Sequence, residues 1–266
     1  PPPTGAGAPP VPRPAAAIWH FRRRLLHKSH LKMCIVWKGQ RMTFATPVEA
    51  VIFDMDGLLL DTESLAMAAL VSAGQALGYD MKDEFCYLMI GAPADKCRAL
   101  VTEKYGADFP LERYFATQEQ HLRELVDAGK MQLKSGVIEI LDELDRQGIK
   151  RAIATSSSRL RTDHHLQLAG IAHRFQDIVT RDDVTRGKPN PDPYLKAASL
   201  LGVAPDRCLA LEDSYNGVRA AVAAKMRVIM IPDLLPATDE MRKVAHRIVT
   251  SLHDAVTHLQ ELRQAA

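Results

Sequence analysis

The chain has 266 residues, 47% of them hydrophobic and 25% charged, a composition typical of a globular protein with one large or two smaller domains. Its apolar runs are too short to cross a bilayer, so we expect no membrane partner. Its four cysteines are widely spaced and form no CxxC pair, which argues against a disulfide framework or a zinc site.

Positive charge is concentrated at the start of the chain. Residues 1–48 hold eight Lys and Arg and no acidic residue, which leaves 26 basic and 32 acidic residues, a net charge of −6, for the remainder. The overall charge of +2 is therefore no reason to expect a nucleic-acid partner.

The first 47 residues are expected to form a disordered extension. Residues 1–17 are rich in Pro and Ala, and such a segment cannot bury a core. Residues 18–41 are basic, and they fit an organelle transit peptide, a tail that touches membranes or nucleic acid, or a segment preceding a natural start at Met42. We favour the last interpretation and a cytoplasmic location. A genuine transit peptide would instead place the protein in an organelle.

The sequence next predicts one strand and then a helical insertion. Residues 51–53 are a short apolar run with the character of a buried strand. Residues 63–130 show no good strand pattern. Leu65 and its successors recur at helical spacing until Gly78, and further helices are predicted near residues 83–90, 94–105 and 111–128.

After this insertion, strands and helices alternate. Helices are predicted near residues 136–147, 161–169, 191–201 and 215–224, with a last one after Ser251, and strands at 151–155, 176–179, 208–211, 228–231 and 247–249. This alternation indicates an α/β fold with a doubly wound, Rossmann-like parallel sheet. We expect a core domain of residues 48–62 and 133–266, with an α-helical cap domain of residues 63–132 inserted into it.

Polar residues follow four of the predicted strands, directly after three of them and, for Lys188, in the loop after the strand at 176–179. In a doubly wound sheet, such positions converge outside the carboxyl ends of the strands. They supply four carboxylates, a pair of hydroxyls and one ammonium group, from Asp54, Asp56, Thr155, Ser156, Lys188, Glu212 and Asp213.

The opening carboxylates determine the chemistry that this set can perform. Asp54 and Asp56 are two residues apart, so they point the same way off an extended backbone and repel each other unless a cation or proton joins them. Mg2+ with oxygen ligands is the usual solution, and Gly57 lets the chain turn sharply away. Taken singly, these motifs also fit a solvated acidic turn, helix-capping hydroxyls and an ordinary loop cation. Together they match Mg2+-assisted phosphoryl transfer in which one carboxylate is the nucleophile.

These motifs resemble the haloacid dehalogenase superfamily, in the branch with a small helical cap that includes β-phosphoglucomutase-like proteins and sugar-phosphate phosphatases. The resemblance covers roughly residues 48–262. It rests on four motifs in order, Phe53-Asp54-Met55-Asp56-Gly57, Ala154-Thr155-Ser156-Ser157, Gly187-Lys188-Pro189-Asn190-Pro191 and Leu211-Glu212-Asp213-Ser214.

The resemblance implies a role for each residue. Asp54 would be the nucleophile that forms an aspartyl-phosphate, Asp56 would be the general acid and base, and Lys188 would neutralise charge on the transferring group. Phosphate or substrate binding is implied for Thr155, Ser156, Gly57 and Glu63. Mg2+ would be held by Asp54, the backbone carbonyl of Asp56, Asp213 and Glu212.

Three positions narrow the activity further. Asp56 argues against the dehalogenases of this superfamily, because a halide leaving group needs no proton. Ala66 and Leu70 stand where β-phosphoglucomutases carry His and Trp, which favours hydrolysis over a mutase reaction. We therefore predict a monomeric phosphatase of small phosphorylated metabolites, most of all sugar phosphates. A phosphosugar mutase, or a non-catalytic phospho-signalling or binding domain, remains the alternative.

One further position departs from the pattern of the relatives. Lys225 stands at the end of the predicted helix 215–224, where many relatives carry Gly. Gly suits a left-handed helix end, so a Lys there should cost a little stability without affecting the chemistry.

Overall fold

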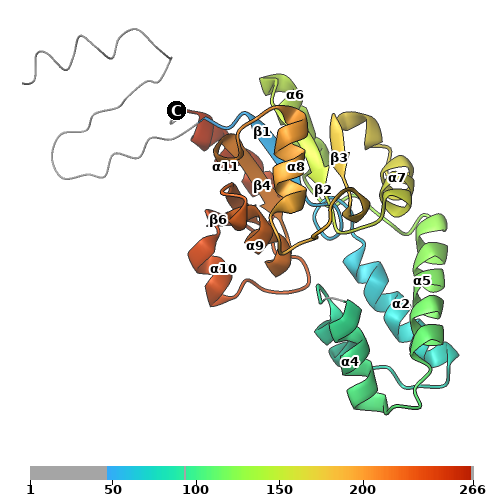
Figure 1. The fold of residues 1–266 in the computed structure, drawn as a ribbon. Coiled ribbons are helices and arrows are strands. Elements are labelled where there is room, and N and C mark those ends of the chain that lie inside the picture. Colours follow the sequence, from blue (N-terminus) through green and yellow to red (C-terminus); the bar gives the residue numbers. More distant parts are fainter. Residues whose placement is uncertain (1–46, 93, 265–266) are drawn as a thin grey trace, which may run out of the picture. The chain divides into compact units, whose positions relative to one another are not determined.

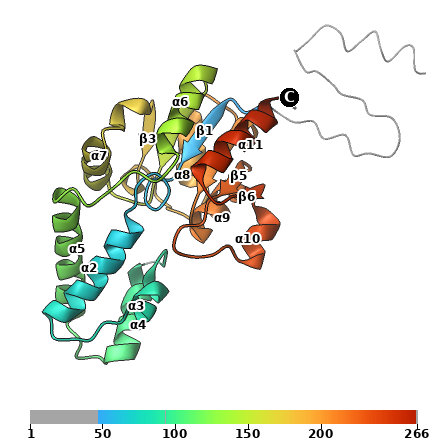
Figure 2. The same cartoon turned by 180° about the vertical axis from the view of Figure 1, so that it is seen from behind.

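The computed structural model describes residues 47–92 and 94–264 (Figures 1 and 2). The expected disordered extension, apart from Pro47, lies outside the described residues. Within the described part, parallel strands form one sheet in the order β3-β2-β1-β4-β5-β6. The strands are β1 (Ala50–Phe53), β2 (Lys150–Ala154), β3 (Asp177–Val179), β4 (Cys208–Glu212), β5 (Arg227–Met230) and β6 (Arg247–Ile248).

Strand β1 lies between β2 and β4, at the point where the strand order reverses. All four of its residues are buried, as expected of a parallel strand whose sheet is covered on both faces. Phe53, the last residue of β1, is level with Ile153 of β2 and with Leu211 of β4. The residues that follow these three strands therefore meet at one edge of the sheet, and the predicted doubly wound parallel fold is confirmed.

Helices cover both faces of this sheet. Alternate residues of β1 point to opposite faces, so Phe53 packs with Ile140 on one face and Ile52 packs with Tyr194 on the other. The first face is covered by α6 (Val137–Gln147), α7 (Arg159–Leu168) and α11 (Leu252–Gln264). The second is covered by α8 (Asp192–Leu201), α9 (Tyr215–Ala223) and α10 (Asp239–Val244), with α8 in front of the sheet in Figure 1.

A helical segment stands between β1 and α6. Its α-helices are α2 (Glu63–Ala76), α3 (Asp83–Cys86), α4 (Ala94–Tyr105) and α5 (Leu111–Asp127), and α2 runs beside α5 (Figures 1 and 2). It has an apolar cluster of its own that includes Phe85, Val101 and Tyr114. Residues 83–90 were predicted as one helix. The structure shows the short α3 followed by a separate 3-10 turn at Tyr87–Met89.

The described residues also bear on two exclusions drawn from composition. Cys86, Cys97 and Cys208 are buried free thiols, and the cysteine spacing had argued against a disulfide framework. Among the described helices, none combines the length and the apolar character that a membrane span requires.

Candidate active site

A cavity of about 340 Å³ opens at the carboxyl ends of β1, β2 and β4. It brings together seven residues predicted from sequence for this site, namely Asp54, Asp56, Glu63, Thr155, Lys188, Asp213 and the more exposed Ser156. Its remaining wall comes from the segment before and at the start of α4, and from the turn after β4, namely Gly91, Ala92, Ala94, Ser214 and Asn216. Asn216 also donates a hydrogen bond to the Gly91 carbonyl at 3.3 Å, so the helical segment and the core meet above the cavity.

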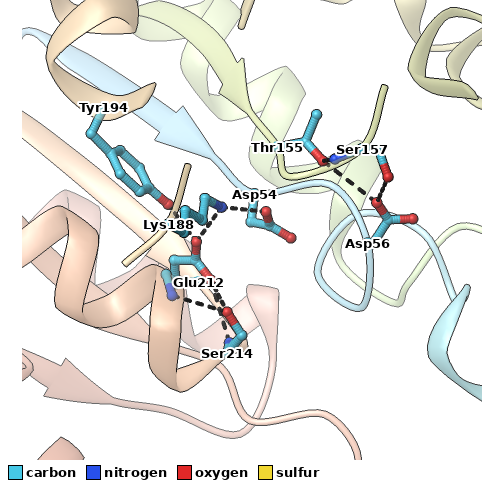
Figure 3. A network of polar contacts seen from close by, with 9 residues as sticks. Asp54, Asp56, Thr155, Ser157, Lys188, Tyr194, Glu212 and Ser214 are labelled. Atoms are coloured by element: carbon cyan, nitrogen blue, oxygen red, sulfur yellow. Dashed lines mark hydrogen bonds and ion pairs between the residues drawn. The ribbon is translucent and has the colours of Figure 1, made fainter. Parts of the chain in front are cut away.

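Lys188 is the cation at the centre of the site (Figure 3). Its Nζ donates to Asp54 Oδ1 and to Glu212 Oε1, each at 2.5 Å. All three side chains are at least nine-tenths buried. Burial alone would favour the neutral amine, but the two carboxylates raise the pKa of Lys188. Lys188 therefore stays charged beside Asp54.

Asp54 follows β1 directly and is strongly perturbed. Burial raises its pKa to about 8, Lys188 opposes that rise, and the carboxylates of Glu212 and Asp56 add to it. The backbone N–H of Asp54 donates to the Leu211 carbonyl, so the residue is fixed at the end of the sheet. A carboxylate held this way, with one oxygen on an ammonium group, is suited to act as a nucleophile or a cation ligand.

Asp56 is turned toward the loop that follows β2 (Figure 3). Its Oδ2 accepts a hydrogen bond from the Ser157 hydroxyl at 2.7 Å and lies 3.5 Å from Thr155 Oγ1. The Thr155 hydroxyl also accepts from the Ser157 backbone N–H at 3.0 Å. Ser157 belongs to the hydroxyl run in the second motif, but the sequence alone did not distinguish it from Ser156. Ser156 and Ser157 form a bend in which the Ser157 N–H bonds back to Thr155, and the sequence carries no signal for that conformation.

Glu212, the last residue of β4, is fully buried, and both its carboxylate oxygens accept hydrogen bonds. Oε1 accepts from Lys188 and from the Tyr194 hydroxyl at 2.6 Å, and Oε2 accepts from the hydroxyl and backbone N–H of Ser214 at 3.0 and 3.3 Å. Burial and the adjacent carboxylates raise the pKa of Tyr194 well above its usual range, so its hydroxyl stays protonated and donates. Sequence reasoning did not single out Tyr194, because nothing in the motifs distinguishes it from an apolar residue of α8.

Asp213 lines the same cavity as Lys188. Its Oδ1 is buried without a hydrogen-bond partner among the described residues, and burial followed by repulsion from Asp54 and Glu212 raises its pKa. Gly57 has φ +81° and passes so close that a Cβ there would clash with the Asp213 carboxylate. Gly57, which was predicted to bind phosphate or substrate, does not line the cavity. The structure shows instead its close approach to the Asp213 carboxylate.

Glu63 places a further carboxyl group at the cavity from the first turn of α2. Burial, with the nearby carboxylates of Asp56 and Asp233, raises its pKa to about 7. Near neutral pH this group can therefore be either a hydrogen-bond donor or an anion.

The carboxylates fit a divalent cation with oxygen ligands. One oxygen from each of Asp54, Glu212 and Asp213 lies within 4.8 Å of the others. The unpartnered Asp213 Oδ1 and the raised pKa values of Asp54 and Asp213 are what such a cation would relieve. Glu212 differs from the other two because both its oxygens already accept hydrogen bonds from the protein.

Comparisons with known proteins identify relatives of this chain. The protein SUPPRESSOR OF QUENCHING 1, chloroplastic, of Arabidopsis thaliana is 32% identical over 218 residues, which are 78% of this chain and 20% of that protein. The chain thus spans about a fifth of that relative. The phosphorylated carbohydrates phosphatase of Thermotoga maritima is 31% identical over 177 residues, 66% of this chain and 82% of that one.

A solved structure and a family model also match this chain. A crystal structure of CbbY from Rhodobacter sphaeroides in complex with phosphate matches with a TM-score of 0.64 and 29% identity, covering 77% of this chain and 95% of that one. The model of the family described as haloacid dehalogenase-like hydrolase matches residues 51–231, which include every residue placed at the cavity. The chain therefore belongs to the haloacid dehalogenase-like hydrolases.

Proposed function

We propose that this chain is a Mg2+-dependent phosphatase that hydrolyses small phosphomonoesters, with sugar phosphates as the favoured class. The observation that carries the proposal is the buried contact of Lys188 with Asp54, beside the partly unsatisfied Asp213. An anionic carboxylate can approach an anionic phosphate only where positive charge offsets their repulsion, and a buried ammonium group supplies such charge. The relative from Thermotoga maritima, named as a phosphatase of phosphorylated carbohydrates, supports the substrate class.

The reaction would proceed in two displacements. Asp54 attacks phosphorus, the bond from phosphorus to the ester oxygen breaks, and a protonated Asp56 gives its proton to the departing alcohol. The resulting aspartyl-phosphate is then attacked by water. Asp56 takes a proton from that water, phosphate leaves, and both aspartates return to their starting forms.

Other side chains would bind the phosphoryl group and organise the two aspartates. Lys188 stabilises negative charge on Asp54 and on the transferring group, while Thr155 and Ser156 bind phosphate oxygens. Ser157 holds Asp56 by its Oδ2, and Asp56 Oδ1, which has no hydrogen-bond partner among the described residues, would exchange the proton with the ester oxygen and the water. Mg2+ would be held by Asp54, Asp213 and the Asp56 carbonyl, beside a Glu212 whose oxygens already accept hydrogen bonds from the protein, and it would supply further charge neutralisation of the phosphate.

Among the described residues, the two positions that would mark a mutase do not favour one. Leu70, at the position of the mutase Trp, is buried in the apolar cluster of the helical segment, and Ala66 offers no group that could hydrogen-bond to Asp56. A mutase and a phosphatase would both use Asp54 as the nucleophile, and these two positions favour the phosphatase.

The first experiment is a hydrolysis assay. The purified protein is incubated with Mg2+ and a panel of sugar phosphates, nucleoside monophosphates and p-nitrophenyl phosphate, beside the Asp54→Asn variant. We expect phosphate release by the wild type and none by Asp54→Asn. Equal activity of the variant would refute the nucleophile assignment, and conversion of β-glucose 1-phosphate to glucose 6-phosphate without phosphate release would identify a mutase. Binding of phosphate esters without turnover would identify a non-catalytic domain.

A matched control separates loss of the nucleophile from loss of the fold. Asp61 belongs to the same loop but its Oδ1 accepts a hydrogen bond from the exposed Ser64 hydroxyl at 2.8 Å, outside the cavity. An asparagine can accept the same bond, so Asp61→Asn should keep wild-type activity.

Several accompanying expectations belong to the same proposal. Residues 63–132 would be a cap over a core formed by residues 48–62 and 133–266, and it would close over bound substrate.

The working unit would be a monomer, which size-exclusion chromatography tests. A cytoplasmic location is expected, with an organelle as the alternative, and imaging of the tagged full chain distinguishes the two.

A further inference from the structure

Tyr194 is a buried tyrosine whose hydroxyl donates to a carboxylate of the candidate active site. Its side chain has no exposed surface, and its hydroxyl lies 2.6 Å from Glu212 Oε1. Its ring centroid lies 5.2 Å from Lys188 Nζ, at the range of a cation–π contact. Tyr194 therefore contacts both partners of the ion pair that faces Asp54 (Figure 3).

Glu212 has no free acceptor capacity once these contacts are counted. A carboxylate offers about four acceptor positions, and Glu212 accepts two donors at each oxygen. Tyr194 and Lys188 share Oε1, so the tyrosine hydroxyl fixes the oxygen on which Lys188 also rests. A carboxylate held on both sides cannot rotate without breaking hydrogen bonds in a dry environment, where they are costly to lose.

We propose that Tyr194 is a positioning residue for the hydrolysis, which holds Glu212 so that Glu212 in turn holds the Lys188 ammonium on Asp54. This inference rests on the proposed function. Glu212 then serves mainly as the anchor of Lys188, and Asp54 and Asp213 remain the carboxylates with capacity for a cation. Tyr194 does not line the cavity, its hydroxyl donates to Glu212 and its ring faces Lys188 Nζ, so it would act through these two residues.

A second buried tyrosine provides a matched control. Tyr114 in α5 also has no exposed surface, but its hydroxyl donates to the Leu70 backbone carbonyl at 3.1 Å, inside the helical segment. Changing either tyrosine to Phe removes one buried hydroxyl and keeps the ring. Only Tyr194→Phe removes a contact to a carboxylate of the site.

The test compares Tyr194→Phe, Tyr114→Phe and the wild type, all with p-nitrophenyl phosphate and Mg2+. We expect Tyr194→Phe to lower kcat about 10-fold with KM within about 2-fold, since a hydrogen bond to a charged group that matters in the transition state is lost. Inhibition by vanadate, which resembles the transition state, should weaken about 10-fold, while inhibition by inorganic phosphate should change less than about 3-fold. Tyr114→Phe should leave kcat within about 2-fold.

A double-mutant cycle tests whether Tyr194 acts through Glu212. In a Glu212→Gln background, adding Tyr194→Phe should change kcat less than about 2-fold, because the tyrosine no longer has a charged partner to position. Equal kcat for Tyr194→Phe and the wild type, or equal losses for the two tyrosine variants, would overturn the inference while leaving the proposed function standing. A full additional 10-fold loss in the Glu212→Gln background would overturn it as well. A wild type that releases no phosphate would overturn the proposed function and this inference with it.

Discussion

The α-carbon of Gly217 faces the Glu212 carboxylate so closely that a Cβ at position 217 would overlap it. Gly217 lies in the first turn of α9, and glycine is a poorer helix former than alanine, by roughly 1 kcal/mol at most. Here it gives the buried carboxylate room beside the helix. We expect Gly217→Ala to displace Glu212 and, with it, Lys188.

The Gly217→Ala variant should therefore lose at least about 10-fold in kcat although its helix propensity improves. Steady-state kinetics with p-nitrophenyl phosphate measure the loss, and thermal unfolding shows whether the fold persists. Ala223→Gly is the control on the same helix, since Ala223 is exposed and the change alters propensity only. Gly217→Ala with wild-type kcat would show that Glu212 tolerates displacement.

The hydrogen bond from Ser157 to Asp56 gives a second prediction. Ser157→Ala removes the 2.7 Å contact that holds Asp56 in its resting position, so Asp56 should sample more orientations. We expect kcat to fall about 3- to 10-fold, by loss of one hydrogen bond to a charged group. The neighbouring Ser158 caps α7 by accepting from the Arg161 N–H at 3.4 Å. Ser158→Ala should instead cost about 1 kcal/mol of stability with little change in kcat, and the reverse pattern would contradict the assignment.

Tyr194 and Ser157 show why sequence reasoning reached only part of the site. Parallel strands of a doubly wound sheet must end at one edge, so residues that directly follow strands could be assigned to one site from their place in the chain. The contacts of Ser157 and Tyr194 join residues 101 and 18 positions apart. They depend on loop conformation and on the depth of α8, neither of which periodicity encodes. The split of residues 83–90 into α3 and a 3-10 turn was missed for a different reason. A short helical run has too few turns for its sequence to separate the two helix types.

Magnesium should stabilise the folded chain as well as support its activity. The pKa values of Asp54 and Asp213 are raised by burial and by repulsion among the carboxylates, so a divalent cation removes an unfavourable interaction in the folded state only. At a concentration 100-fold above its dissociation constant, such a ligand adds about 2.7 kcal/mol to the free energy of unfolding. Thermal unfolding at pH 8 should therefore shift upward by several degrees with Mg2+ relative to NaCl of equal ionic strength.

Asp213→Asn tests where that cation binds. The variant should lose most of the Mg2+-dependent shift in melting temperature, while Asp61→Asn should keep it. Chelation should abolish phosphate release in the wild type, and Mg2+ should restore it. A shift that persists unchanged in Asp213→Asn would place the cation elsewhere.

Glu63 predicts a particular pH dependence of stability in the absence of divalent cations. Its pKa rises from an ordinary value of 4.5 to about 7 through burial and the nearby carboxylates of Asp56 and Asp233. Between these two values the folded chain keeps a proton that the unfolded chain has lost. Stability from this group is therefore present below about pH 4.5 and is lost as pH rises toward 7.

Urea unfolding of the wild type and of Glu63→Gln at pH 5 and pH 8, both with a chelator, isolates this contribution. The variant should gain on the wild type as pH rises, by at most about 3 kcal/mol, since each pKa unit corresponds to about 1.4 kcal/mol. Parallel pH dependence of the two proteins would show that the Glu63 carboxyl is not perturbed by burial.

Lys225 gives a prediction about stability alone. It follows α9 with φ 61°, and it is the non-glycine residue with positive φ in the described part of the chain. Its backbone N–H still donates to the Val222 carbonyl, so the left-handed turn ends the helix as a glycine would. A side chain in this conformation costs roughly 1 kcal/mol relative to glycine, once the greater freedom of glycine in the unfolded chain is included. Lys225→Gly should therefore raise the free energy of unfolding by about that amount and leave kcat unchanged. Lys225→Ala, which removes the ammonium group but keeps the Cβ, should give no such gain, and equal stabilisation by both substitutions would assign the effect to charge instead of backbone strain.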